Sequence, residues 1–303
     1  MQHLIDIGSL DTQQVQRIFH ITDQIRRSDT PLQQILAGEF AVNLFYENST
    51  RTRVAFEIAA KKLGVELINV QSAGSSVAKG ENLTDTFHTL RAMGVRLFNI
   101  RHSSVGAAQQ LTTTCPTGTH IINAGDGVHA HPTQALLDAY TLREQYGDLS
   151  DKTIVIAGDL LHSRVARSDI AILKLLGVQD LRLAAPTDLH IEPAQVLEGQ
   201  SYTDFDAALQ NADAVIMLRI QKERFDENES LDETTYHQQW GLNQKRLQQC
   251  KTGCKVLHPG PVNRGIEITD EVVDGPQSLV LDQVKFGVYV RMAVMLAMFK
   301  PDF

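Results

Sequence analysis

Short apolar, β-branched runs alternate with helical patterns along most of the chain. Each run is short enough to be a single strand, and the segments between them show the wider apolar spacing of helices. Strands separated by helices are typical of βαβ units around a parallel sheet, where functional residues gather beyond the carboxyl ends of the strands. The predicted strands are Phe40–Phe45, Val65–Val70, Leu97–Ile100, His120–Asn123, Thr153–Ala157, Leu181–Ala185, Ala214–Met217 and Lys255–Leu257.

The segment Pro132–Tyr146 has a helical pattern, with Pro132 in the first turn and Gly147 as its stop. The run that follows at 153–157 resembles the first strand of a second sheet. We therefore predict an α/β protein of two doubly wound domains, each a parallel sheet flanked by helices, joined by this linking helix. The predicted domains are residues 1–140 and 141–283, with a final helix at about 284–303 that packs back on the first domain.

Composition narrows the classes of function. The chain has 303 residues, 43% of them hydrophobic, and a formal net charge of −8 from 36 Asp and Glu against 28 Lys and Arg. This is a globular composition of a length that favours two domains, with a single barrel as the competitor. An acidic balance argues against a partner that is nucleic acid or an anionic membrane, because both need a basic surface. It does not exclude small anionic ligands.

Cysteines and termini indicate the compartment. The three cysteines, Cys115, Cys250 and Cys254, show no spacing of a disulfide framework or of a zinc site. The start of the chain lacks the basic and apolar regions of a signal peptide. The apolar stretch Gly287–Phe299 is interrupted by Arg291 and is too short to span a bilayer. A soluble, cytoplasmic protein is expected.

Several polar segments follow predicted strands. The segment 45–53, F-Y-E-N-S-T-R-T-R, places hydroxyls and an Arg at the start of a helix that carries Ala55, Ile58, Ala59 and Leu63 near one face. Such an N-terminus is suited to an anion, most naturally phosphate, although a Ser/Thr cap beside surface arginines is the plainer interpretation. In the segment 75–86 a Ser/Gly stretch carrying Lys79 precedes a helix predicted to begin near Glu81, and a solvated loop is its plainer interpretation.

Further candidates lie after later strands. Arg101 and His102 follow the strand 97–100, and His131 stands just before the linking helix, where the helix dipole disfavours an imidazolium and favours a neutral donor. A satisfied structural His is the alternative. In the second half no glycine follows Gly158 as far as Arg167, so the dinucleotide fingerprint of a dehydrogenase is absent.

Two more segments of the second half are polar. Arg219 and Gln221 alternate with Leu218 and Ile220, which directs both polar side chains to one side of an extended backbone. The segment 258–265, H-P-G-P-V-N-R-G, is a rigid loop able to offer backbone carbonyls. Each segment is weak evidence alone. Together they place five cations at strand ends or in loops of a net-acidic protein: Arg51, Lys79, Arg101, Arg164 and Arg219.

These segments, in this order, resemble the catalytic chains of aspartate carbamoyltransferases, within the wider aspartate/ornithine carbamoyltransferase family. The resemblance covers about residues 40–295. It rests on F-Y-E-N-S-T-R-T-R at 45–53, S-S-V-A-K-G-E at 75–81, R-H at 101–102, N-A-G-D-G-x-x-x-H-P-T-Q-A-L-L-D at 123–138, G-D-L at 158–160 with Arg164, L-R-I-Q-K-E-R at 218–224 and H-P-G-P-V-N-R-G-I-E-I at 258–268.

The resemblance implies a carbamoyl phosphate domain followed by an aspartate domain, a site between them, and a homotrimer with shared active sites. Catalytic residues would be Arg51, Thr52, Lys79, Arg101 and His131. Residues binding carbamoyl phosphate would be Ser49, Thr50, Arg51, Thr52, Ser75, Arg101, His131, Gln134, Gly260 and Pro261. Residues binding aspartate would be Lys79, Arg164, Arg219 and Gln221, with Ser75 and Lys79 reaching into a neighbouring subunit's site.

The implied reaction joins carbamoyl phosphate and L-aspartate to give N-carbamoyl-L-aspartate and phosphate, an early step of pyrimidine biosynthesis. Carbamoyl transfer requires neither a protein nucleophile nor a metal or cofactor, and we expect the departing phosphate to accept the amine proton. Family members occur as free trimers, with regulatory chains or with dihydroorotase, and the sequence does not choose among these partners.

Two rivals remain. An ornithine carbamoyltransferase usually has Cys where this chain has Thr133, and H-C-L-P where this chain has H-P-G-P at 258–261. The pair Arg219 and Gln221 together with Lys79 also suits an anionic acceptor better than ornithine. A non-catalytic scaffold of the same fold would be expected to lack some phosphate-binding or His residues, and every matched position here is filled.

Overall fold

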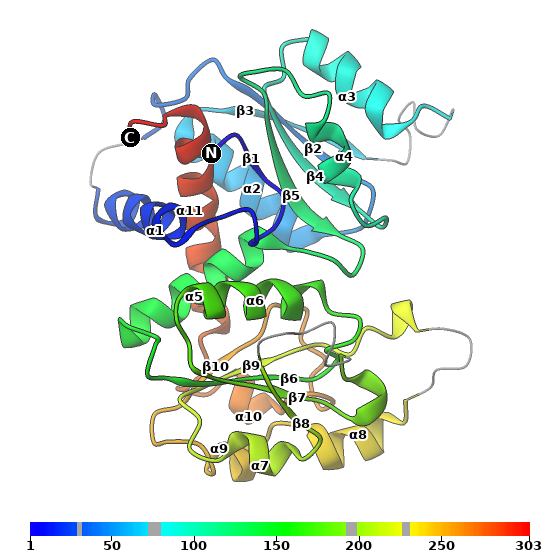
Figure 1. The fold of residues 1–303 in the computed structure, drawn as a ribbon, viewed down its shortest axis with the longest axis vertical. Coiled ribbons are helices and arrows are strands. Elements are labelled where there is room, and N and C mark those ends of the chain that lie inside the picture. Colours follow the sequence, from blue (N-terminus) through cyan, green and yellow to red (C-terminus); the bar gives the residue numbers. More distant parts are fainter. Residues whose placement is uncertain (29–31, 72–79, 192–198, 226–230) are drawn as a thin grey trace. The chain divides into compact units, whose positions relative to one another are not determined.

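The computed structural model of the chain divides into two compact units (Figure 1). Unit 1 comprises Met1–Leu136 and Lys285–Phe303, and unit 2 comprises Leu137–Val284. The divisions fall inside two helices, α5 (Pro132–Tyr146) and α11 (Val280–Phe299). The described residues are 1–28, 32–71, 80–191, 199–225 and 231–303.

In the described part of unit 1, a sheet of five parallel strands has the order β1-β5-β4-β2-β3. The chain passes from β2 to β3 on one side of β2 and then crosses to the other side to form β4. The direction of winding therefore reverses between β2 and β4. The elements are β1 (His3–Leu4), α1 (Thr12–Arg27), β2 (Phe40–Phe45), α2 (Thr50–Leu63), β3 (Glu66–Gln71), α3 (Leu83–Ala92), β4 (Leu97–His102), α4 (Ala107–Thr112) and β5 (His120–Asp126).

Helices cover both faces of this sheet, so most residues of its central strands β2, β4 and β5 are buried on either side. On one face, Phe87 of α3 and Leu111 of α4 join the core formed by the strands. On the other face lie α1, α2 and α11 (Figure 1). The Arg291 guanidinium of α11 lies over the Phe56 ring of α2, 5.1 Å from its centroid.

A row of asparagine side chains crosses the face that α2 covers. Asn43 on β2 is in register with Asn69 on β3 and Asn99 on β4. The Asn99 Nδ2 donates to Asn43 Oδ1 at 2.8 Å, and the Asn43 Nδ2 donates to Asn69 Oδ1 at 2.8 Å. A longer bond of 3.5 Å joins Asn43 Nδ2 to the carbonyl of Arg53. Because buried amides need partners, this row ties the first turn of α2 to the three strands beneath it.

In the described part of unit 2, five parallel strands have the order β10-β9-β6-β7-β8. The winding reverses between β6 and β9, on the same principle as in unit 1. Figure 1 shows α5 and α6 on one face of this sheet and α7, α8 and α9 on the other. The elements are β6 (Thr153–Ala157), α6 (Arg164–Leu175), β7 (Asp180–Ala184), β8 (Gln200–Tyr202), α7 (Phe205–Leu209), β9 (Ala214–Met217), α8 (Glu233–Trp240), α9 (Gln244–Leu247), β10 (Lys255–Leu257) and α10 (Asp270–Val273), with 3-10 turns at Thr187–Leu189 and Lys222–Arg224.

The predicted α/β class with two parallel sheets is confirmed, and every predicted strand is present. Four have the predicted bounds, and β4 and β5 extend two and three residues further than predicted. Arg101 and His102 are therefore the last residues of β4 and do not follow it. The two-residue β1 and the three-residue β8 were not predicted, because His3–Leu4 and Gln200–Tyr202 contain no apolar run.

Two helix predictions are confirmed, and one was wrong in detail. The helix expected near Glu81 is α3, which begins at Leu83 because the Asn82 side chain accepts a hydrogen bond from Asp85 N and caps it there. Ile58 does not face the core with Ala59 and Leu63, since it is 40% exposed and Phe56 occupies the buried face instead. The predicted helix Pro132–Tyr146 has the bounds of α5.

In the part of the chain that the structure describes, no helix is both long and apolar enough to cross a bilayer.

Candidate functional site

Unit 1 carries one group of predicted site residues where the winding of its sheet reverses. Ser49 follows β2, and Arg101 lies at the end of β4, whose register pairs it with Phe45. The Arg101 carbonyl accepts a hydrogen bond from Tyr46 N at 2.8 Å, which holds the segment after β2 against β4. In open parallel sheets the reversal point leaves a crevice beyond the carboxyl ends, and ligands bind there.

The N-terminus of α2 forms one side of this group. Ser49 is the N-cap residue in extended conformation, yet its side chain makes no capping hydrogen bond. By contrast, the Asp11 side chain caps α1 and the Asn82 side chain caps α3. Thr50, Arg51 and Thr52 lie in the first turn, where Arg51 is exposed and Thr52 is buried. A helix start with hydroxyls, no acidic residue and an arginine favours an anionic ligand.

Arg101 is held from two directions. Its Nη1 donates to the Ala124 carbonyl on β5 at 3.2 Å, and its Nε lies 3.3 Å from Glu47 Oε2. The Arg101 side chain is 13% exposed, so these contacts restrict most of its rotamer freedom. A cation fixed this way loses little further freedom when it binds an anion.

Asp126 organises the turn between β5 and α5. Its buried carboxylate accepts hydrogen bonds from Gly106 N at 2.8 Å, Ala130 N at 3.1 Å and Asn123 Nδ2 at 2.8 Å. This turn leads into His131.

His131 is buried, and its carbonyl accepts the first hydrogen bonds of α5, from Gln134 N at 3.0 Å and Ala135 N at 3.2 Å. Gln134, the third residue of α5, is buried as well. β4 pairs in parallel with both β2 and β5. The segments that follow these three strands therefore lie at the same edge of the sheet. The structure thus brings Ser49–Thr52, Arg101 and His131 to one edge of one sheet.

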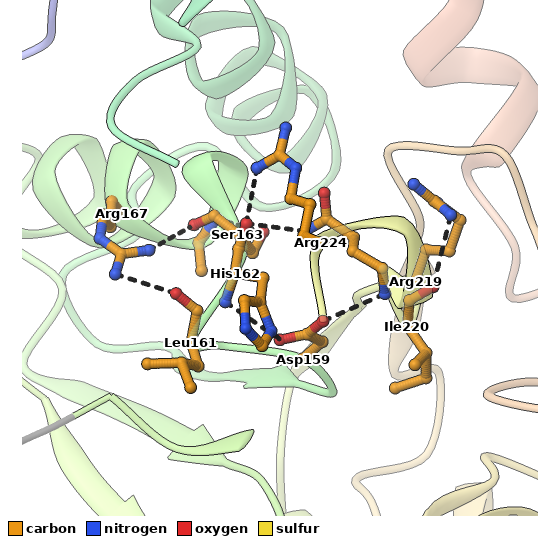
Figure 2. A network of polar contacts seen from close by, with 10 residues as sticks. Asp159, Leu161, His162, Ser163, Arg167, Arg219, Ile220 and Arg224 are labelled. Atoms are coloured by element: carbon orange, nitrogen blue, oxygen red, sulfur yellow. Dashed lines mark hydrogen bonds and ion pairs between the residues drawn. The ribbon is translucent and has the colours of Figure 1, made fainter. Parts of the chain in front are cut away.

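Unit 2 carries the second group, again where the winding reverses. Arg164 is the first residue of α6 after β6, and Arg219 and Gln221 follow β9. The buried carboxylate of Asp159 joins the two loops: its Oδ1 accepts from His162 N at 3.1 Å, and its Oδ2 accepts from Gln221 N at 3.1 Å (Figure 2). Asp159 therefore fixes the distance between the segments that follow two neighbouring strands.

Arg219 and Gln221 have different partners. The Arg219 guanidinium forms a two-bond ion pair with Glu223, with Nη1 to Oε2 at 2.9 Å. This pairing, chiefly through its hydrogen bonds, raises the pKa of Arg219 and lowers the pKa of Glu223. Gln221 Nε2 donates to the His162 carbonyl at 3.0 Å. Leu218 and Ile220 are buried, so the predicted alternation of polar and apolar side chains is confirmed.

Gly260 and Pro261 follow β10, the strand next to β9. The peptide bond between them is cis. Gly260 N donates to His258 Nδ1 at 2.8 Å, which anchors the turn to the end of its strand. The predicted residues of the second group thus lie after three neighbouring strands, β10, β9 and β6.

Two predicted residues, Ser75 and Lys79, lie outside the described residues. Conversely, sequence reasoning gave no role to Glu47, Asp126, Asp159 or Glu267, which hold the predicted residues in place. All four stand inside the segments that carry the family resemblance, which was the available signal. Their individual roles could not be read from it, because only the folded chain shows which backbone amides and arginines they face.

Comparison with known proteins agrees with this architecture. The family model for the carbamoyl-P binding domain of aspartate/ornithine carbamoyltransferases matches residues 2–144. The model for the Asp/Orn binding domain matches residues 150–298. The chain belongs to the aspartate/ornithine carbamoyltransferase family. A member of this family, the aspartate carbamoyltransferase catalytic subunit of Stenotrophomonas maltophilia, is 45% identical over 301 residues, covering 97% of this chain and 95% of its own.

Solved structures of this family share the fold. The aspartate transcarbamoylase of Trypanosoma cruzi, in complex with carbamoyl phosphate and aspartate, superposes with a TM-score of 0.86 at 26% identity, covering 97% of this chain and 95% of that one. The ornithine carbamoyltransferase of Pyrococcus furiosus gives a TM-score of 0.89 at 23% identity, covering 100% and 98% of the two chains. At that identity the second likeness concerns the fold alone.

Proposed function

We propose that this chain is an aspartate carbamoyltransferase that transfers the carbamoyl group of carbamoyl phosphate to the amine of L-aspartate. The products are N-carbamoyl-L-aspartate and phosphate, which places the reaction in pyrimidine biosynthesis. The observation that carries the proposal is the position of four arginines, Arg51, Arg101, Arg164 and Arg219, at the reversal points of the two sheets. Both substrates are anions, and each unit supplies its own cations.

Unit 1 would bind carbamoyl phosphate. Ser49, Thr50, Arg51 and Thr52 would surround the phosphate at the N-terminus of α2, with Arg101 as the second cation. The carbamoyl oxygen would accept hydrogen bonds from Thr52, Arg101 and His131, and Gln134 would orient the carbamoyl amine. The resemblance also assigns the backbone of Gly260 and Pro261 to this substrate. Ser75 is assigned here by the resemblance alone.

The chemistry needs a stabilised oxyanion more than it needs a protein base. When the amine attacks the carbamoyl carbon, negative charge develops on the carbonyl oxygen and then on the departing phosphate. Fixed donors aimed at such an oxygen are worth about 3–4 kcal/mol each in well-studied enzymes. The phosphate leaves as a base that accepts the amine proton. His131, at a helix start that disfavours an imidazolium, serves as a neutral donor.

Unit 2 would bind aspartate. Arg164, Arg219 and Gln221 would contact the two carboxylates of the substrate, and an arginine fork is better suited to this than a lysine. Glu223 holds the Arg219 fork in one orientation. Two arginines near the acceptor would repel the side-chain ammonium of ornithine, which favours aspartate over the ornithine alternative.

Assembly completes the proposal. We infer a homotrimer in which Lys79, with Ser75, contributes to the site of a neighbouring chain.

The test is an assay of the purified protein with carbamoyl phosphate and either aspartate or ornithine. We expect carbamoyl aspartate and phosphate in equal amounts, and no citrulline. Product with ornithine alone would replace the proposal by the ornithine reaction. No product with either amine, in protein that still binds phosphate, would favour the non-catalytic scaffold.

A further inference from the structure

A continuous chain of buried hydrogen bonds in unit 2 leads from α5 to the turn after β10. Gln283 Nε2 donates to Asp138 Oδ1 of α5 at 2.6 Å. On its other side, Gln283 Oε1 accepts from His258 N at 2.8 Å. All three residues are at most 2% exposed. The backbone of His258 is thus tied to a helix that lies far away in the sequence.

The imidazole of His258 continues this chain. Its Nδ1 accepts from Gly260 N at 2.8 Å, and its Nε2 lies 3.0 Å from Glu267 Oε1. The same Glu267 oxygen accepts from Asn263 N at 2.7 Å. The side chains of His258 and Glu267 are fully buried. Together they hold the two ends of the segment 260–263.

These contacts determine the tautomer of His258. An amide N–H donates to Nδ1, so Nδ1 must carry a lone pair, and the ring proton is on Nε2. Nε2–H then donates to Glu267 Oε1. The same oxygen accepts the hydrogen bond from Asn263 N. Removing either partner leaves a buried polar group unsatisfied, which costs far more than the net gain of making one bond. Loss of either side chain should therefore disfavour this arrangement of the turn.

We propose that His258 and Glu267 are positioning residues that fix the Gly260–Pro261 turn for binding of carbamoyl phosphate. This inference rests on the proposed function, which assigns the backbone of that turn to the same substrate. Neither side chain touches the substrate in this proposal. His258 and Glu267 orient the backbone of the turn through their hydrogen bonds to Gly260 N and Asn263 N. Gly260 and Pro261 have no polar side chains that could do so.

Four variants separate positioning from general stabilisation. His258→Gln keeps a polar group near the Nε2 position and loses the acceptor for Gly260 N, whereas His258→Asn places an oxygen near the Nδ1 position. Glu267→Gln keeps the accepting oxygen, and Glu267→Met removes it at similar size. Gln277→Ala is the matched control, because it removes one side-chain bond, to the Cys254 carbonyl at 2.9 Å, at the other end of β10.

Binding of carbamoyl phosphate is measured by calorimetry and the aspartate KM by assay at saturating carbamoyl phosphate. We expect His258→Gln and Glu267→Met to weaken carbamoyl phosphate binding about tenfold or more, by analogy with the loss of residues that orient metal ligands. Glu267→Gln and Gln277→Ala should stay within about threefold of the parent chain, because both keep the hydrogen bonds of the turn. His258→Asn keeps an acceptor for Gly260 N but loses the bond to Glu267, so its affinity should fall between the two groups. The aspartate KM should change little in all five.

Hydrogen exchange at the Gly260 amide reports on the turn without any catalytic readout. Protection should be present in the parent chain and in Glu267→Gln, and lost in His258→Gln. Lost protection with unchanged carbamoyl phosphate affinity would overturn the proposal, and so would unchanged protection. Equal impairment of Glu267→Gln and Glu267→Met would also overturn it.

If the variants do not fold, nitrogen NMR of the parent chain still tests the tautomer of His258 on which the proposal depends. The expected state of His258 is protonated at Nε2 and unprotonated at Nδ1, and the reverse tautomer or an imidazolium would contradict the proposal. Failure of the proposed function is seen separately, as a parent chain that does not carbamoylate aspartate.

Discussion

Arg51 and Arg219 are both arginines of the proposed site, but their surroundings differ. Arg51 is an exposed residue in the first turn of α2, whereas Arg219 is held by a two-bond ion pair with Glu223. At the level of single residues, the first is placed by a helix and the second by a neighbouring carboxylate. Arg51 lies in unit 1 and Arg219 in unit 2, so we expect their removal to affect different substrates.

We expect Arg51→Ala to weaken carbamoyl phosphate binding about 10- to 100-fold, the range for a lost hydrogen bond to a charged group. Arg219→Ala should leave that affinity near normal and raise the aspartate KM instead. Calorimetry with carbamoyl phosphate and initial rates against aspartate measure the two effects. Arg53→Ala, two residues further along α2, is the control and should change neither. Loss of both activities together with helical circular dichroism would contradict these separate roles.

Asp169 is a buried carboxyl in α6 that shapes stability as a function of pH. Burial, and then the charge of Asp138, raise the pKa of Asp169 well above its ordinary value. Neither of its side-chain oxygens has a hydrogen-bond partner among the described residues. Above the unfolded pKa of about 4 the unfolded chain releases this proton while the folded chain keeps it, so stability falls as pH rises.

Asp169→Asn should therefore stabilise the protein at pH 7, by about 1–3 kcal/mol if the amide satisfies the buried position. The gain should shrink as pH is lowered towards 4. Denaturant unfolding at several pH values measures this. Asp148→Asn is a control of opposite sign, because hydrogen bonds from Ser150 lower the pKa of exposed Asp148. A gain from Asp169→Asn that does not depend on pH would refute the explanation.

At the level of elements, α2 shows how a helix is placed so that its N-terminus can bind an anion. The hydrogen-bonded asparagines Asn43, Asn69 and Asn99 tie the first turn of α2 to the sheet. The helix ends at Gly64, which has a left-handed backbone conformation. The Gly64 N–H donates to the carbonyls of Ala60 and Lys61. A Cβ at Gly64 would lie 1.9 Å from the Gln33 carbonyl oxygen, so the chain before β2 packs directly on this cap.

Gly64→Ala should accordingly destabilise the protein by about 3 kcal/mol or more, from backbone strain together with a backbone clash. Gly38→Ala is the matched control. Gly38 has a similar φ of +86°, against +83° at Gly64, but an added Cβ meets nothing within 4 Å. It should cost only the left-handed strain of about 1–2 kcal/mol. Equal losses in chemical denaturation would show that the Gln33 contact is unimportant.

For the whole molecule, the proposal of a shared site predicts both mass and complementation. Light scattering should give about three times the 33.6 kDa mass of one chain. Lys79→Ala and Arg51→Ala chains should each be nearly inactive. Reassociating the two together should restore part of the activity, because some hybrid sites would combine an intact Arg51 with a neighbour's intact Lys79. Reassociating either variant with itself is the control, and hybrid trimers without restored activity would count against sharing.

The net charge of −8 is a property of the whole molecule. It describes the protein as seen from a distance, and it argues against nucleic acid as a partner. It says nothing about local fields at the reversal points, where Arg51, Arg101, Arg164 and Arg219 gather. A net-acidic chain can therefore bind two anionic substrates.

Much of the fold was readable from the amino-acid sequence because central parallel strands are buried on both faces and appear as continuous apolar runs. This is why β2, β6 and β9 have their predicted bounds, and the edge strand β10 shares this property because Val256 and Leu257 are buried. Motif order was equally readable, and it led to the correct family. The orientation of α2 was less so, since both Ile58 and Phe56 are apolar and only packing decides which one is buried.

Only the tertiary structure decided the rest. Strand order depends on long-range pairing, so the reversal points between β2 and β4 and between β6 and β9 could not be read from local patterns. The same holds for the polar groups that support the site. Glu267 is indistinguishable in sequence from a surface carboxylate, and it becomes a buried partner of His258 because the chain after β10 folds back over its own strand. Local patterns specify elements, whereas pairing across the sequence specifies which side chains meet.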